Sequence, residues 1–143
     1  MTGNWVGPNM QHSQPRIEKA RLEASSRLNP GRRADFGQFM TPRRTADFMA
    51  GLFDLSGCPS IRLLDAGAGV GSLTAAFLEK ARASGQRLND VSVTAYELDE
   101  FLASYLSGEI AADQQLFREA GIEFAADLIG GDFIESAVNQ IQS

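Results

Sequence analysis

The segment Leu63–Ser72, with the sequence LLDAGAGVGS, decides how the rest of the chain is interpreted. Ile61, Leu63 and Leu64 form a short apolar run, which is typical of a parallel strand covered on both faces. Asp65 closes this run. Three alternating glycines follow it: Gly67, Gly69 and Gly71. The order predicts a buried strand, a tight glycine turn and the start of a helix.

Helical spacing begins directly after the glycine turn. From Ser72 to about Ala83 the apolar residues recur on one face of a helix. Glycines let the backbone turn tightly and let a ligand approach closely. The start of the helix offers free N–H groups and a positive dipole end, which suit a carboxylate or a phosphate. Asp65 can attract an ammonium group, either directly or through water.

These features fit S-adenosylmethionine (SAM) better than a dinucleotide. The dinucleotide fingerprint G-x-G-x-x-G needs its third glycine at position 72, where this chain has Ser72. SAM carries an amino group that Asp65 would attract, whereas the pyrophosphate of NAD would be repelled. The less favoured alternatives are a NAD-dependent enzyme and a tight turn in an unrelated α/β protein.

The composition is that of one domain without disulfides. The chain has 143 residues, of which 43% are hydrophobic. Its single cysteine, Cys58, excludes a disulfide framework or a cysteine-based zinc site within the chain and favours the reducing cytoplasm. The single histidine, His12, lies in a polar stretch and is interpreted as a solvated tail residue. No apolar run reaches the roughly 18 residues of a membrane span, and Met1–Gln14 lacks the order of a signal peptide.

The net charge of −5 is unevenly distributed, with basic residues in excess over positions 1–50 and acidic residues in excess beyond them. The arginines that could meet phosphates are Arg27, Arg32, Arg33, Arg43 and Arg44. A solvated helix face and loop is the favoured explanation for them. The acidic balance argues against nucleic-acid binding by this chain unaided.

Three parts are expected along the chain: a disordered tail over 1–14, N-terminal helices over 15–56, and a partial SAM-binding domain over 57–143. The expected elements are a helix from Pro15 to about Leu28, a helix from Pro42 to about Leu55, a strand Ile61–Asp65, a helix Ser72–Ala83, a strand Val91–Tyr96, a helix from Phe101 to about Ala120, a strand Ile122–Ile129, and an amphipathic tail that ends at Ser143. Strands that alternate with helices predict an α/β fold with a parallel sheet.

The second helix has a recognisable start. Thr41 is expected as its N-cap and Pro42 as its first residue. Its apolar face is expected to comprise Ala46, Phe48, Met49, Leu52 and Phe53.

Acidic residues also follow the second and third strands. Glu97, followed by Leu98, ends the second strand, where a carboxylate can accept both hydroxyls of a ribose. Asp99 is interpreted as the N-cap of the next helix. After the third strand, Asp132 could accept a hydrogen bond from an exocyclic amine, and Phe133 could lie against an adenine ring. An ordinary strand-end acid and a simple turn are the alternatives.

The segment GQFMTP at 37–42, followed by ADFM at 46–49, resembles the N-terminal motif of N6-adenine DNA methyltransferases. The similarity is greatest to the large methylases of type IIG and related type I restriction–modification systems, and it covers about residues 34–135. It implies a Rossmann-like class I methyltransferase fold, of which this chain holds the N-terminal half, with parallel strands in the order 3-2-1. It also implies SAM as the cofactor. The residues that it implicates are Phe39, Thr41 and Pro42 at the methionine end, Asp65, Gly67, Gly69 and Gly71 in the loop, Glu97 with Leu98 at the ribose, and Asp132 with Phe133 at the adenine.

The sequence departs from this family in one respect. These enzymes carry a catalytic Asn/Asp-Pro-Pro-Tyr/Phe motif after their fourth strand, and no such motif occurs in the 143 residues. In the family this motif accepts the protons of the target amine and stacks on the flipped base. No catalytic residue is therefore assigned, and the chain is expected to be inactive alone. DNA is the expected partner of the complete enzyme, with weak or no binding by this chain.

The missing fourth strand should leave the strand Ile61–Asp65 with an open, apolar edge. We expect this edge to be covered by a second copy, by a separate catalytic chain, or by sequence outside these residues. Two other functions stay open. One is another class I methyltransferase that acts on RNA, protein or a small molecule, and the other is a non-catalytic half-Rossmann assembly module.

Overall fold

The structure, a computed structural model, describes residues 14–31 and 40–142. Its centre is a parallel sheet in the order β1-β2-β3, formed by β1 (Ser60–Ala66), β2 (Asp90–Tyr96) and β3 (Glu123–Ile129). In the register, Leu63 of β1 lies beside Val93, which lies beside Ala126 of β3. The predicted α/β class and the predicted strand order 3-2-1 are both confirmed.

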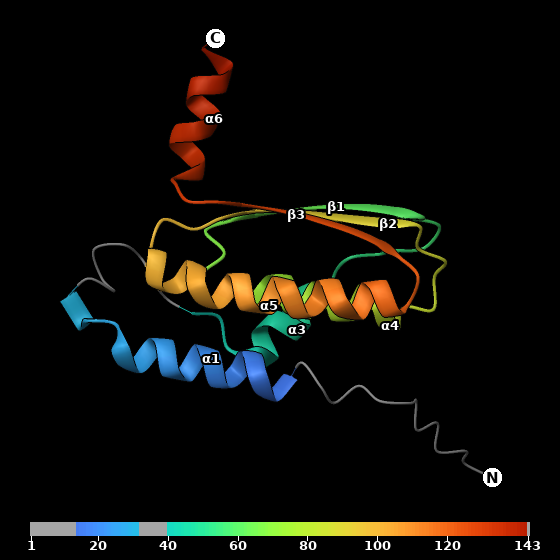
Figure 1. The fold of residues 1–143 in the computed structure, drawn as a ribbon, viewed down its shortest axis with the longest axis horizontal. Coiled ribbons are helices and arrows are strands. Elements are labelled where there is room, and N and C mark those ends of the chain that lie inside the picture. Colours follow the sequence, from blue (N-terminus) through green and yellow to red (C-terminus); the bar gives the residue numbers. More distant parts are fainter. Residues whose placement is uncertain (1–13, 32–39, 143) are drawn as a thin grey trace.

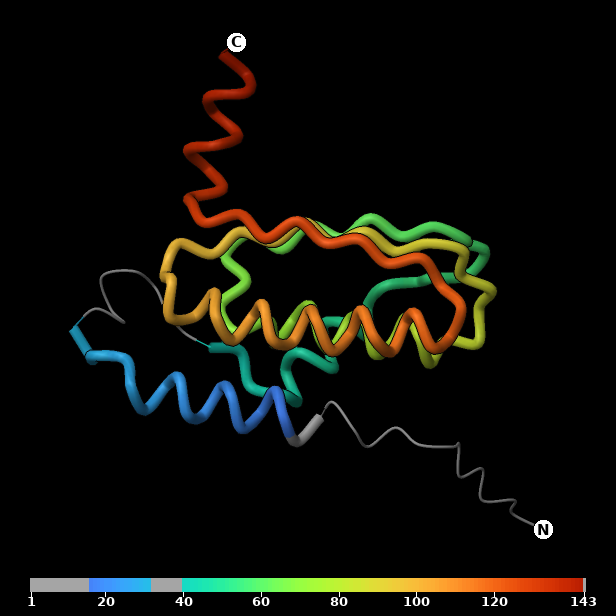
Figure 2. Tube along the Cα trace, in the orientation of Figure 1, coloured from blue at the N-terminus to red at the C-terminus, as the bar shows by residue number. Residues whose placement is uncertain are grey.

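Helices connect the strands and cover one face of the sheet. Between the strands run α4 (Ser72–Ala83) and α5 (Glu100–Glu119), and α1 (Gln14–Arg27) and α3 (Arg43–Gly51) lie against these two helices (Figure 1). α6 (Phe133–Ile141) follows β3 and extends away on the opposite side of the sheet (Figure 2).

The hydrophobic core lies between the sheet and the helices beneath it. Val91 and Val93 of β2 and Phe117 of α5 are almost completely buried there. The ring of Phe117 stacks on that of Phe124, with centroids 5.2 Å apart. Since β2 and α5 both contribute fully buried side chains, they anchor the residues at their ends, including Glu97 and Asp99.

The expectation that β1 is covered on both faces is wrong for the part of the chain that the structure describes. Ile61 is buried against the helices, but Leu64 points to the other face and is 53% exposed. The cause is topological. Parallel connections are right-handed, so strands that follow one another in a single direction place all their helices on the same side. Helices can cover the second face only where the chain reverses the direction in which it adds successive strands to the sheet.

α3 starts one residue later than predicted. Pro42 occupies the N-cap position in an extended conformation, and no side chain caps the helix, so Thr41 does not play the capping role expected of it. The carbonyl of Pro42 accepts the hydrogen bond from Ala46 that opens the helix. Because proline has no N–H, it suits a position where the helix needs only an acceptor.

α3 also ends earlier, at Gly51, and its predicted apolar face is largely exposed. It packs on α4 through the small residues Ala46 and Ala50, while Phe48 is 67% exposed and Leu52 70%. The ammonium of Lys80 on α4 donates to the carbonyls of Gly51 and Phe53. Small residues allow close approach of the two helices, and the lysine binds carbonyls at the carboxyl end of α3.

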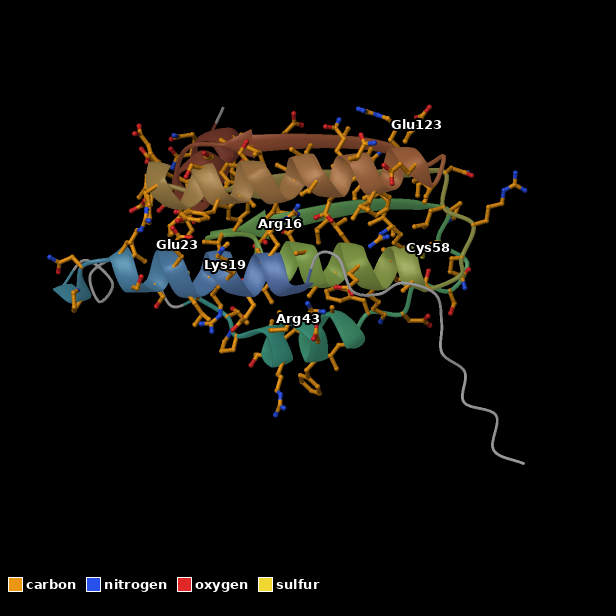
Figure 3. All side chains as sticks on the ribbon, turned by 60° about the horizontal axis from the view of Figure 1, so that its bottom comes forward. Arg16, Lys19, Glu23, Arg43, Cys58 and Glu123 are labelled. Atoms are coloured by element: carbon orange, nitrogen blue, oxygen red, sulfur yellow. The ribbon has the colours of Figure 1, made fainter. Side chains whose placement is uncertain are left out.

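α1 docks on the other helices through an apolar strip and one ion pair. Ile17, Ala20 and Ala24 are buried. The guanidinium of Arg16, labelled in Figure 3, forms two hydrogen bonds with the buried carboxylate of Glu109 on α5, at 2.8 and 2.9 Å. This bidentate pair joins residues that are 93 positions apart in the sequence. The predicted first helix is thus confirmed. Within 14–31 and 40–142, no helix is both long and apolar enough to cross a bilayer.

Candidate functional site

The glycine loop between β1 and α4 is tied to the end of β2. The backbone amides of Gly67 and Ala68 both donate to the carbonyl of Tyr96, at 2.9 and 2.8 Å. Gly67, Gly69 and Gly71 all adopt positive φ, at 92°, 59° and 89°. Such backbone angles are accessible mainly to glycine, so the alternating glycines shape this loop.

Gly71 also has a packing reason to be glycine. A Cβ at this position would lie 2.9 Å from Cδ1 of Leu106 on α5. At Gly67 and Gly69, in contrast, a Cβ would meet nothing within 4 Å among the described residues. The first two glycines therefore leave the loop backbone open, while the third lets α4 approach α5.

Glu97 bridges the two strand ends. Its Oε2 accepts a hydrogen bond from the amide of Gly69 at 2.7 Å, and its Oε1 accepts one from the amide of Asp99 at 2.8 Å. A carboxylate offers about four acceptor positions, so two bound amides leave capacity for further donors. The structure thus brings Glu97 to the glycine loop. Leu98 beside it is 57% exposed, and Asp99 caps α5 as expected.

Asp65 lies at the end of β1 and contacts α4. Its Oδ2 accepts a hydrogen bond of 2.6 Å from the hydroxyl of Thr74. Burial raises the pKa of the Asp65 carboxyl, and the hydroxyl and the backbone amide of Thr74 lower it in part. The side chain points to the helix-covered face of the sheet, because it alternates with Leu64 and Ala66 on the other face.

Asp132 and Phe133 lie at the start of α6. Oδ1 of Asp132 caps this helix by accepting hydrogen bonds from Ile134 at 2.7 Å and Glu135 at 3.2 Å. The ring of Phe133 packs edge-on against Tyr96, with centroids 5.3 Å apart. Phe133 is therefore brought to the end of β2, near the carbonyl that holds the loop. This capping role uses only Oδ1 of Asp132 and leaves Oδ2 outside the cap.

The Thr-Pro segment reaches the same region through its neighbours. Phe39 lies outside the described residues. Met40 packs against an apolar cluster that includes Val70 of the glycine loop and Ala75 of α4. Arg43, labelled in Figure 3, donates to Glu79 of α4 at 3.0 Å and so fixes the start of α3 on that helix. Thr41 and Pro42 lie between these two anchored residues, and Thr41 is half-buried.

Three residues that contribute to this site were not predicted from the sequence: Thr74, Tyr96 and Met40. Thr74 carries a usable signal, since it is a polar residue on the otherwise apolar buried face of α4. Met40 lies within the GQFMTP segment. The role of Tyr96 rests on its carbonyl, which no side-chain pattern reveals.

Two of the arginines considered for phosphate binding pair with carboxylates, whereas Arg44 is exposed. Arg27 pairs with Glu23, and Arg43 pairs with Asp47 as well as Glu79. Arg32, Arg33 and His12 lie outside the described residues. In the described part of the chain no group of three or more metal-ligating side chains occurs.

Comparison with known proteins relates this site to methyltransferases. No protein-family model matches the chain. The chain is 39% identical over 121 residues to the Type II methyltransferase M.BsuBI of Bacillus subtilis, and 34% identical over 125 residues to the Type II methyltransferase M.PstI of Providencia stuartii. These matches cover 85% and 87% of this chain, which spans 22% and 24% of the two relatives.

A solved structure supports the same conclusion for the fold. A protein of Listeria monocytogenes, assigned to the class I SAM-dependent methyltransferases, superimposes with a TM-score of 0.60 at 16% identity. The match covers 85% of this chain and 34% of the other. The chain is thus a homologue of the Type II methyltransferases over most of its length, and its fold is that of the class I SAM-dependent methyltransferases.

Proposed function

We propose that this chain is the SAM-binding portion of an N6-adenine DNA methyltransferase of a restriction–modification system and does not methylate DNA alone. The observation that carries this proposal is the link between Glu97 and Gly69. It joins the acidic residue after β2 to a glycine loop with three positive φ angles, in a homologue of Type II methyltransferases.

The residues around the loop fit the groups of SAM. Asp65 would attract the ammonium, and the uncapped start of α4 would bind the carboxylate. Glu97, with Leu98 alongside, would accept the ribose hydroxyls. The open backbone at Gly67 and Gly69 supports close approach of a ligand. Bound SAM supplies the electrophilic methyl group, and these residues orient it.

Four further residues complete the proposed cofactor site. Phe133 would lie against the adenine ring, and Asp132 would accept from its exocyclic amine through Oδ2, the oxygen that does not cap α6. Thr41 and Pro42 would contact the methionine end, together with Phe39. The packing of Met40 against the cluster around Val70 supports this location.

The substrate and partners are proposed for the complete enzyme. The GQFMTP segment and the Type II relatives favour adenine in DNA over RNA, protein or a small molecule. The Asn/Asp-Pro-Pro-Tyr/Phe motif is not among the 143 residues, so another polypeptide segment must supply the base-binding residues. We propose a cytoplasmic location, in keeping with a DNA substrate.

The unpaired edge of β1 supports association with such a segment. β1 is an edge strand within the described residues, and Leu64 on its bare face is 53% exposed. An apolar edge invites pairing with another strand. A complementary catalytic polypeptide is the favoured occupant, and a second copy of this chain is the alternative, which would suit an assembly module.

Titration calorimetry with SAM tests the proposed function. The intact chain should bind SAM, and Glu97→Ala should weaken binding by about tenfold or more, because the ribose hydroxyls and the loop both lose an acceptor. Glu100→Ala, three positions along and exposed, is the matched control and should bind like the unchanged chain. Equal affinity for all three proteins, or no binding by the intact chain, would contradict the proposal.

A further inference from the structure

Thr74 occupies an unusual position in the first turn of α4. It is only 2% exposed, and the other buried polar residues in the described ranges are the charged Glu109 and Asp113. A buried helical hydroxyl commonly donates to a carbonyl one turn earlier in its own helix. The hydroxyl of Thr74 donates instead to Oδ2 of Asp65, in a different element.

Through this bond, Thr74 affects the ionisation of the Asp65 carboxyl. Its length of 2.6 Å is typical of a hydroxyl that donates to a carboxylate. A hydroxyl has one proton to donate, so the bond favours the ionised carboxylate over the neutral acid. Burial acts in the opposite direction and favours the neutral acid. Thr74 therefore offsets part of the cost of keeping a charge at this buried strand end.

We infer that Thr74 is a positioning residue of the cofactor site, which fixes Oδ2 of Asp65 so that the ionised carboxylate presents Oδ1 to the ammonium of SAM. This inference rests on the proposed function. Thr74 itself contacts no substrate atom in this scheme and acts through Asp65. The inference predicts a defect limited to ligands that carry the amino-acid end of SAM.

Two substitutions and two ligands test this inference. Thr74→Val keeps the shape of the side chain and removes the donor, whereas Thr74→Ser keeps the donor. SAM carries the ammonium, and 5′-methylthioadenosine lacks the whole amino-acid end. By calorimetry, Thr74→Val should bind SAM about tenfold more weakly and methylthioadenosine unchanged. Thr74→Ser should restore SAM affinity to within about twofold of the unchanged chain.

The pH dependence supplies a second readout. Without the hydroxyl, the pKa of Asp65 should be higher, so the loss of SAM affinity on acidification should begin at a higher pH in Thr74→Val. Carbon NMR of the Asp65 carboxyl measures the same change without any ligand. A role for Thr74 in packing alone, without a bond to Asp65, would leave this titration unchanged.

Each remaining outcome decides against the inference. Unchanged SAM affinity in Thr74→Val, or an equal loss for SAM and methylthioadenosine, would overturn it while the proposed function stands. Failure of the unchanged chain to bind either ligand would overturn the proposed function and this inference together. The Asp65 titration would then still report whether the Thr74 bond exists.

Discussion

Oε2 of Glu97 accepts a hydrogen bond from the backbone amide of Gly69 at 2.7 Å, and this bond joins the residue after β2 to the middle of the loop after β1. The same carboxylate holds the amide of Asp99, the residue that caps α5. One side chain therefore couples the glycine loop to the start of a helix. The conformation of the loop should depend on this carboxylate even before a ligand binds.

Glu97→Gln should loosen the glycine loop. An amide side chain has one acceptor oxygen, so it cannot accept from Gly69 and Asp99 through two different oxygens. We expect the amide of Gly69 to exchange at least about tenfold faster, and the free energy of unfolding to fall by about 1 kcal/mol. Hydrogen exchange by NMR and denaturant unfolding measure the two effects. Glu100→Gln should change neither, and an unchanged exchange rate in Glu97→Gln would contradict the coupling.

Gly71→Ala should destabilise the chain by about 2–3 kcal/mol. The new Cβ would meet Leu106 at 2.9 Å, and the φ of 89° disfavours any side chain. Gly108→Ala is the contrasting variant, since Gly108 lies within α5 with nothing within 4 Å of the added methyl group among the described residues. It should stabilise the chain by about 0.5–1 kcal/mol. Urea unfolding measures both effects, and the same shift of the unfolding midpoint in the two variants would contradict this interpretation.

Arg16→Ala should detach α1 from α5. It would leave the buried carboxylate of Glu109 without its bidentate partner, which should cost about 2–3 kcal/mol because Arg16 itself is partly exposed. Arg27→Ala, on the same helix, removes only an exposed pair with Glu23 and should cost less than about 0.5 kcal/mol. Thermal unfolding monitored by circular dichroism compares the two variants, and similar losses would contradict the assigned role of the Arg16 pair.

Asp113 should make the stability of the chain depend on pH. Burial, first of all, and then the neighbouring carboxylate of Glu109 raise its pKa to about 7, an effect that Glu79 of α4 reinforces. The guanidinium groups of Arg16 on α1 and Arg82 on α4 lower it in part. Between about pH 4 and pH 7, the folded state therefore keeps a proton on Asp113 that the unfolded state has already lost. This contribution to stability is complete below about pH 4 and is lost as the pH rises to about 7.

Asp113→Asn should remove this loss of stability with rising pH, because an amide cannot ionise. At pH 8 the variant should be more stable than the unchanged chain by about 2 kcal/mol, and the difference should shrink as the pH falls towards 5. Urea unfolding at a series of pH values measures it. Asp127→Asn, on the exposed face of β3, is the control. A constant difference between Asp113→Asn and the unchanged chain would show that the ionisation of Asp113 is not the cause.

Leu64→Lys should reduce self-association through the bare face of β1. We expect the unchanged chain to sediment as a concentration-dependent mixture of monomer and larger species, because an edge strand with an apolar face is exposed. The lysine should shift the mixture towards monomer. Leu22→Lys, at an exposed leucine on α1, should not. A monomeric unchanged chain with slowly exchanging Leu63 and Leu64 amides would contradict the open edge.

The local elements were largely predictable from the sequence. Alternation of strands and helices, the stop after Arg27 and the cap at Asp99 depend on the periodicity and chemistry of near neighbours. The three alternating glycines permit the tight turn that the sequence predicted, because glycine adopts positive φ without steric cost. The order of the strands was implied by the resemblance to methyltransferases, and no local pattern in the sequence specified it.

The predictions that were wrong concern features that depend on contacts between residues far apart in the sequence. α3 ends where Lys80 of α4 binds the carbonyl of Gly51, and its Phe48 and Leu52 are exposed because two alanines already provide the contact. Whether β1 is covered on both faces depends on the side on which α4 and α5 pack. Periodicity marks a residue as apolar, but it does not say what will cover it.

The sequence by itself determined the class of fold and the chemistry of the glycine loop, since both rest on short-range backbone preferences and on the order of a few residue types. Only the tertiary structure decided that Thr74 holds Asp65, that Glu97 binds the amide of Gly69, and that Arg16 reaches Glu109. These bonds join elements that are separate along the chain. Their partners are set by how the strands and helices pack, which no local pattern specifies.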